Sequence, residues 1–302
     1  NVTQDVKKDM NACEDYFQLV TNAHIAAAVL DVMKVVSLSE VRKKFSEKSA
    51  MEKIAMFSML VDEVCRTYMC ADLNMGAKKK ASKEIDHVVE YAKESLTLGM
   101  IFLELKDAIR EGDGTRVLRC WKYLFLLFRG SGHTNYCLEA LILLAQYYYI
   151  LPPRLAEQMI WGRFVNYEGK IGGNISADLH IEHVNRTCKE AIQHLGANLT
   201  PQAIVQCGKA IGKLTKLEEC FDKMNGIATS GSHTRRSDGE DFEKIVQELT
   251  AKEVFKIHPG RQHSKFPKFQ SNGIIFSIKK NKFQKWMDDH LSELFNNSFL
   301  SR

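Results

Sequence analysis

Apolar residues recur every three or four positions along most of the chain, a spacing typical of amphipathic helices. Early segments of this kind cover residues 17–32 and 54–68, and a long one runs from about Lys83 to Arg110. Two more strongly apolar segments follow at 117–128 and 135–151. Buried strands are the alternative for these two segments, but their length and their many leucine and alanine residues favour helices. We therefore predict an all-α, multi-helix domain.

Glycine and proline residues predict where these helices begin and end. The turn Gly112-Asp113-Gly114-Thr115 can end one helix in the left-handed region and cap the next. Pro152-Pro153 predicts the start of a helix that ends near Val165, and Pro201 predicts another that continues through Phe221. Towards the C-terminus we expect a short helix at 242–254, one strand at 273–278 and a last helix at 283–294.

A change of composition divides the chain. Residues 229–239 are rich in Ser, Thr, Gly and Arg, which predicts a linker. We therefore expect a helical domain at 1–228, a linker at 229–240 and a small basic C-terminal appendage at 241–302. Because the sequence starts at Asn1 and enters directly on an amphipathic pattern, we expect the helical domain to be truncated at its N-terminus.

The composition is that of an ordinary globular protein, with 45% hydrophobic and 26% charged residues. No apolar run approaches the roughly 20 residues that a membrane span needs, and the sequence does not start with a signal-peptide pattern. The cysteines are scattered without a C-x-x-C pair, which favours reduced thiols over a disulfide framework or a zinc site. We therefore expect an intracellular protein, nuclear or cytoplasmic, that is not secreted and has no membrane partner.

The net charge is +5, and the excess of basic residues is concentrated in the C-terminal region. Between Lys252 and Lys285 there are nine Lys or Arg residues and one acid, Glu253. This asymmetry predicts a surface that faces a polyanion such as DNA. The candidate nucleic-acid contacts are Lys256, Arg261, Lys265, Lys268, Lys279, Lys280 and Lys282.

Aromatic residues alternate with these basic residues. Cations on phosphates together with rings for base stacking would bind a single-stranded nucleic acid. The alternative is that the rings form the small core of the appendage. The rings in question are Phe255, Phe266, Phe269, Phe276, Phe283 and Trp286.

The helix predicted at about 176–195 concentrates polar side chains. Its apolar face, which we expect to be core, consists of Ile181, Val184, Cys188, Ile192 and Leu195. A second stripe contains Asp178 and Glu182, and two carboxylates four residues apart on a helix can share a divalent cation. Glu182 with Asp178 is therefore the candidate metal or acid/base site, and His183 could be a partner of these carboxylates. The alternative is a solvated face balanced by Arg186 and Lys189.

Three stretches of the chain resemble an uncharacterised family, the domain of unknown function 6589. They are GDGTRVLRCWKYL, NYCLEALILLAQ and LPPRLAEQMIWGRFVNYEGKIGGNISADLHIEHVNRTCKEAI. The family signature W-x-R-F-V-N, G-x-x-G-x-N and D-L-x-x-E-H-x-N-R-x-x-K is matched at 161–166, 169–174 and 178–189. The resemblance covers roughly residues 5–221.

This resemblance implies a transposon-derived protein, because the family recurs in multicopy, transposon-like genes. Longer members carry acidic motifs in a strand-rich portion upstream of the region that this chain covers. A transposase with a ribonuclease-H-like core gathers carboxylates from strands and a late acid from a helix around two metal ions. The resemblance thus implies that the chain is the helical part of a larger α/β catalytic domain. Glu182 would be its late acid, with Asp178 and His183 in support and Mg²⁺ or Mn²⁺ as cofactor.

The sequence carries none of the strands that would hold the other acids, so we expect no catalysis by this chain alone. The leading hypothesis is a fragment of a transposon-derived protein that processes or binds nucleic acid, with DNA as its partner. The alternative is a non-catalytic helical scaffold or protein-interaction module.

Overall fold

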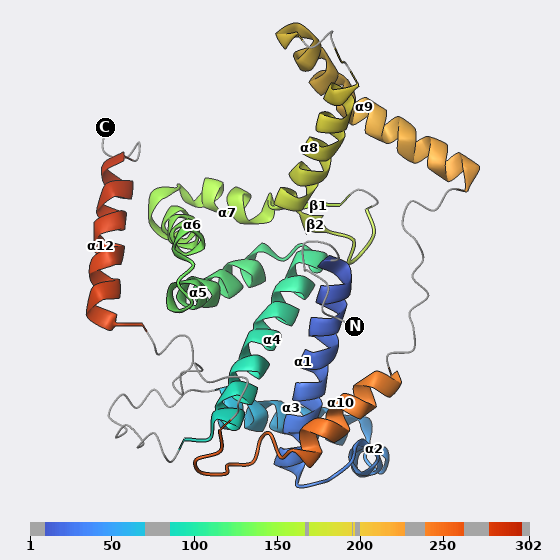
Figure 1. Ribbon diagram of the computed structural model, residues 1–302, viewed down its shortest axis with the longest axis vertical. Coiled ribbons are helices and arrows are strands. Elements are labelled where there is room, and N and C mark those ends of the chain that lie inside the picture. Colours follow the sequence, from blue (N-terminus) through green and yellow to red (C-terminus); the bar gives the residue numbers. More distant parts are fainter. Residues whose placement is uncertain are drawn as a thin grey trace. The chain divides into compact units, whose positions relative to one another are not determined.

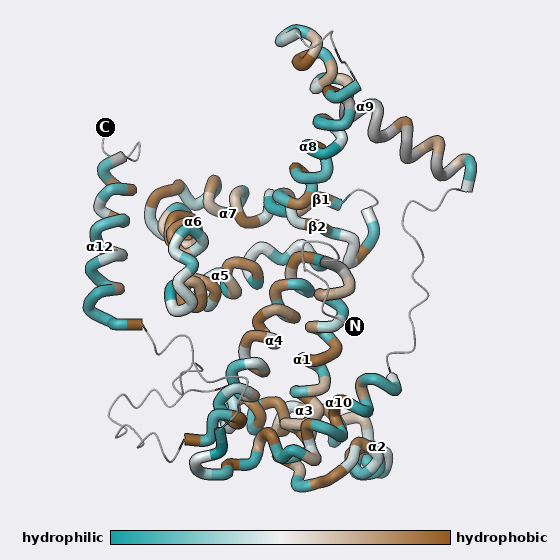
Figure 2. The backbone as a smooth tube through the Cα atoms, in the orientation of Figure 1, coloured by the Kyte–Doolittle hydropathy of each residue, from teal (hydrophilic) through white to brown (hydrophobic). Residues whose placement is uncertain are grey.

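The computed structural model describes residues 10–69, 85–166, 169–194, 196, 200–226, 239–262 and 278–297. Almost all of these residues are helical, which confirms the all-α prediction (Figure 1). Hydrophobic and hydrophilic residues alternate along most helices, as amphipathic segments require (Figure 2). Among the described residues, no single helix is long and apolar enough to span a membrane. The bent pair of α1 and α2 together would be long and apolar enough, judged by length and composition alone. The chain forms two compact units.

The first unit contains residues 1–105, 119–150 and 237–302. Its helices are α1 (Met10–Met33), α2 (Leu38–Ser46), α3 (Ala50–Val64), most of α4 (His87–Glu111) and of α5 (Gly114–Gly130), α6 (Thr134–Ala145), α10 (Gly239–Ala251) and α12 (Lys280–Asn297), with short π-helical turns η1 (Cys65–Met69) and η3 (Gln146–Ile150).

Helix α1 carries small residues that let its neighbours approach closely. Ala23 and Ala28 are fully buried, and Ala23 belongs to a cluster with Val246 of α10. Gly99 of α4 lies so near α1 that a Cβ there would be 2.4 Å from Cγ2 of Thr21. A larger side chain in place of Ala23 or Ala28 would therefore push α1 away from the helices that pack on it.

A second cluster in this unit joins α5, α6 and α12. Phe283 of α12 packs on Phe125 of α5, with ring centroids 5.3 Å apart, and on the buried Cys137 of α6. Trp286 completes the cluster and stacks on Phe283. Of the six rings predicted in the C-terminal region, Phe255, Phe283 and Trp286 pack on other helices of this unit and do not form a separate core of the appendage. The other three rings lie outside the described residues.

The second unit contains residues 106–118 and 151–236. Its elements are the last turn of α4, the start of α5, α7 (Pro153–Trp161), β1 (Phe164–Val165), β2 (Ile175–Ser176), α8 (Ala177–Gln193) and α9 (Pro201–Asn225). The two short strands form an antiparallel hairpin in which Phe164 pairs with Ser176 and Val165 with Ile175. The expectation of a helix ending near Val165 was therefore wrong. The helix ends at Trp161, and the backbone becomes extended after Gly162 to pair with β2.

This division differs from the predicted one. Residues 239–262 and 278–297, placed in a separate appendage by the sequence, group with the N-terminal helices. Helix α10 packs on α1 because Val246 and Leu249 supply apolar surface that a solvated tail would not have. Residues 273–277 of the predicted strand and most of the predicted linker lie outside the described residues.

Candidate functional site

The hairpin β1–β2 holds the family signature in a tight turn. Asn166 donates from Nδ2 to the carbonyl of Lys170 at 2.8 Å, which closes the turn across the strand ends. Gly172 follows with a φ of +68°, in the left-handed region that favours glycine. The glycines of the G-x-x-G-x-N motif therefore serve the shape of the turn.

Asn174, the last residue of that motif, joins the turn to the end of α4. Its Nδ2 donates to the carbonyl of Arg110 at 2.8 Å, and its backbone N–H points to the same oxygen at 3.3 Å. Arg110 returns a bond from Nε to the carbonyl of Gly172 at 3.5 Å. The carbonyls at the end of a helix have no partner within the helix, so Asn174 satisfies one that α4 leaves open.

The same hairpin sets the start of α8. Ser176 is the N-cap, and its Oγ accepts a hydrogen bond from the N–H of Leu179. The N–H of Ala177 donates to the carbonyl of Arg163 at 2.7 Å. Asp178 lies in the first turn, where the positive end of the helix dipole stabilises a carboxylate.

Arg163 is the other charged residue of the signature at this corner. Burial lowers the pKa of its guanidinium, and the nearby charge of Asp178 partly opposes that shift. Its Nε and the Oδ1 of Asn166 are buried and have no hydrogen-bond partner among the described residues. The charge of Asp178 therefore acts on the half-buried Arg163. The sequence predicted a metal role for Asp178 and did not predict this one.

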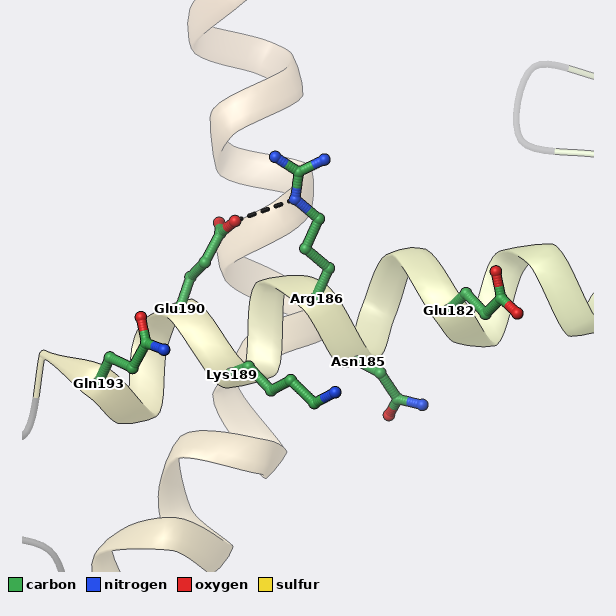
Figure 3. Close-up of a pocket in the computed structure, with 6 residues that line it drawn as sticks. All are labelled: Glu182, Asn185, Arg186, Lys189, Glu190 and Gln193. Atoms are coloured by element: carbon green, nitrogen blue, oxygen red, sulfur yellow. Dashed lines mark hydrogen bonds and ion pairs between the residues drawn. The ribbon is translucent and has the colours of Figure 1, made fainter. Parts of the chain in front are cut away.

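The polar face of α8 is an open depression of about 490 Å³. It is lined by Glu182, Asn185, Arg186, Lys189, Glu190 and Gln193. Figure 3 shows that Arg186 turns towards Glu190, with 3.0 Å between Nε and Oε1, while Glu182 stands apart from this pair. All six side chains come from one helix, so the depression has no second wall.

The predicted site residues of α8 are all exposed. Asp178, Glu182 and His183 lie within the first two turns. Over the part of the chain that the structure describes, no three His, Cys, Asp or Glu side chains gather in a way that could hold a metal ion. A metal site at Glu182 would therefore need a ligand from outside this set.

The apolar face of α8 differs from its prediction as core. Ile181 is 54% exposed and Val184 is 37% exposed, while Cys188 and Ile192 are half-buried. Leu195 lies outside the described residues. The prediction was wrong for the first half of this face, because the helix contacts its own hairpin and α9 without either of them covering Ile181.

The predicted nucleic-acid contacts fall into three groups. Lys279, Lys280 and Lys282 are exposed at the start of α12. Lys265 and Lys268 lie outside the described residues.

The third group is engaged within the protein. Lys256 pairs with Glu253 at 2.7 Å. Arg261 is used internally: its Nε, Nη1 and Nη2 all donate to protein oxygens, among them the carboxylate of Asp86. The nucleic-acid role of Arg261 stays a prediction, and its donors could reach a phosphate only by leaving these bonds.

Two further basic residues belong with the exposed lysines. Lys285 is exposed one turn after Lys282. Arg129 of α5 lies over the ring of Trp286, 4.8 Å from its centroid. The periodicity of the sequence contains no signal for Arg129, because its partner lies more than half the chain away.

Comparison with known proteins shows the family of the chain. The family described as "Family of unknown function (DUF6589)" matches residues 2–233. The chain belongs to this family. The DUF6589 match contains the hairpin and all of α8 and α9, whereas α10 and α12 follow it. No curated protein and no solved structure matches the chain.

Proposed function

We propose that this DUF6589 member binds DNA through the lysines at the start of α12. Lys279, Lys280, Lys282 and Lys285 stand within seven residues and are all exposed. Ion pairs of the described residues involve other lysines, such as Lys252 with Glu248 and Lys256 with Glu253, and none of these four. Four neighbouring cations that pair with no acid of the described residues are the observation that carries the proposal.

The backbone of α12 strengthens the attraction for an anion. The N-terminus of a helix carries a partial positive charge, and α12 has no acidic residue in its first turn. Lysines in that turn repel both one another and the helix dipole. A phosphate backbone removes this repulsion, so binding and the stability of the first turn support each other.

The rings beside these lysines favour contact with phosphates over stacking on bases. Phe283 is buried, and Trp286 is half-buried with Arg129 across its face. Neither ring offers an open face on which a base of single-stranded DNA could stack. The surface should therefore bind duplex DNA through its backbone, with little preference for sequence.

The proposal is tested by the affinity of the full chain for a short fluorescent duplex at low salt. Lys280→Gln with Lys282→Gln should weaken binding about tenfold, since each removes one phosphate contact. Lys244→Gln with Lys252→Gln is the matched control, because it removes the same charge from α10 and the residue that follows it, and both lysines pair with acids. Equal loss in both variants would contradict the proposal.

Deleting everything after Gly239 would be a poor test of DNA binding, because α10 is part of the core.

The resemblance also supports a transposon-derived origin and, for a longer parent protein, a metal-dependent reaction at DNA. The exposed carboxylates Asp178 and Glu182 do not form a complete metal site in the described residues. Binding of DNA therefore remains the function proposed for this chain, and the metal role is a separate prediction.

A further inference from the structure

Helix α9 carries apolar residues at alternating spacings of four and three, the pattern of a coiled coil. These positions are Ala203, Cys207, Ala210, Leu214, Leu217, Phe221 and Met224, and they are called the α9 seam below. The pattern extends over three heptads, longer than one helix packed on a small domain normally needs. It predicts that α9 meets another helix along most of its length.

Only the first half of the α9 seam is covered. Ala203, Cys207 and Ala210 are half-buried, and α9 contacts α8. In the second half, Leu217 is 69% exposed, Phe221 is 60% exposed and Met224 is 86% exposed. Apolar side chains in a continuous row are rarely left this open in a soluble protein unless they meet a partner.

The length of α8 explains why it cannot cover the rest. Helix α8 has 17 residues and α9 has 25, and the two are joined by residues 194–200. Even laid fully antiparallel from that connection, Ala177 at the start of α8 would stand opposite Leu217. Phe221 and Met224 would still have nothing beside them on α8.

The charges beside the α9 seam indicate which partner fits it. In the heptad pattern of the sequence, Lys209, Lys213 and Lys216 occupy positions on one flank of the seam, while Glu218 and Asp222 occupy positions on the other. Two identical helices can pair parallel and in register. A residue on the flank just before a seam position, such as the one preceding Leu214, then lies opposite the residue five positions later in the other helix. Lys213 of one copy would then face Glu218 of the next, and the relation holds twice by symmetry. An antiparallel pair would instead bring lysine flank against lysine flank.

From this we infer that a second copy of the chain binds along the α9 seam, parallel and in register, centred on Leu217, Phe221 and Met224. The contact is two-fold symmetric, so each seam residue meets its own counterpart. It is short, so the dimer is weak and depends on concentration. It is independent of the lysines of α12 and goes beyond the proposed binding of DNA.

The first experiment measures the mass of the full chain in solution over a range of concentrations. The wild type should pass from monomer to dimer, and Phe221→Glu should weaken the dimer more than about tenfold, because it places a charge in the centre of the contact. Val205→Glu is the matched control: Val205 lies on the same helix, is 56% exposed and stands off the seam. A wild type that stays monomeric throughout, or a Phe221→Glu variant that dimerises like Val205→Glu, would overturn the inference.

The second experiment tests the direction of the two helices. Lys213→Glu and Glu218→Lys should each weaken the dimer about threefold to tenfold by setting like charges opposite one another. The double variant should recover the wild-type dissociation constant, because it restores both pairs with their signs exchanged. A dimer that is not restored in the double variant would rule out the parallel arrangement. Circular dichroism of all variants checks that helix content is unchanged.

Discussion

The carboxylate of Asp86 holds the guanidinium of Arg261, 175 residues further along the chain, with Nε at 3.0 Å from Oδ1 and 3.1 Å from Oδ2. Asp86 is buried and also accepts hydrogen bonds from the N–H groups of Val88 and Val89, so it caps α4. Arg261 donates further to the carbonyls of Lys252, Glu253 and Lys256. This pair fixes the segment after α10 to the start of α4.

Removing the arginine should therefore destabilise the fold. Arg261→Met leaves the Asp86 carboxylate buried without its charge partner, and we expect a loss of about 3 kcal/mol in the free energy of unfolding. Urea unfolding followed by circular dichroism measures it. Lys256→Met, which removes an exposed cation five residues away, should leave the unfolding midpoint unchanged. Equal midpoints for the two variants would show that the Asp86–Arg261 pair does not stabilise the chain.

His24 predicts a second effect, on the pH dependence of stability. Burial lowers the pKa of His24 below its usual 6.5, more than its hydrogen bond to the Val20 carbonyl raises it. The unfolded chain therefore takes up a proton at a higher pH than the folded chain does. The contribution of His24 is fully present above the unfolded pKa and is lost as the pH falls from there towards the folded pKa.

The measurement is the unfolding midpoint at neutral pH and at about pH 5. The wild type should lose stability between the two, and His24→Gln should lose less, since its side chain does not titrate. If both proteins lost the same amount, the pH dependence would belong to other groups.

Asn174 gives a third prediction, for the second unit. Asn174→Asp replaces the amide donor with a carboxylate that repels the carbonyl of Arg110, so we expect a loss of about 1–2 kcal/mol. Hydrogen exchange of residues 106–118 should rise at the same time. Asn185→Asp, on the exposed face of α8, is the matched control and should change neither quantity. Unchanged exchange in Asn174→Asp would mean that the turn does not hold the end of α4.

The carboxylates of α8 give a fourth prediction. If Asp178 and Glu182 share a cation, calorimetry should detect Mn²⁺ or Mg²⁺ with a dissociation constant of about 1 mM, because two exposed carboxylates form a weak site. Glu182→Gln should abolish the heat, and Glu190→Gln, which lies on the same helix and removes the partner of Arg186, should keep it. Equal heats in the wild type and Glu182→Gln would reject the metal role.

The sequence predicts the helices well where one side of a segment is apolar over several turns. The helix expected from about Lys83 to Arg110 is α4, which ends at Glu111, and the turn at Gly112 has the expected left-handed backbone, with a φ of +71°. Lys83 itself lies outside the described residues. Periodicity works here because α4 contributes buried residues such as Leu96 to the core.

Periodicity fails where an element is too short or where a partner is distant. Strands β1 and β2 have two residues each, so no alternation can develop, and Phe164 and Val165 look like the continuation of α7. Arg261 looks like one more cation in a basic segment, because its acid lies 175 residues away. Lys280 and Lys282 are exposed at the start of α12, although Phe283 beside them is buried.

The most direct test of the proposed DNA binding is the dependence of affinity on salt. For duplex DNA, the logarithm of the binding constant falls linearly with the logarithm of salt concentration, with a slope of about −0.9 for each phosphate contact. Lys280→Gln with Lys282→Gln should make this slope shallower by about 2, while Lys244→Gln with Lys252→Gln should leave it at the wild-type value. A slope that is the same in all three proteins would contradict the claim that the lysines of α12 contact DNA.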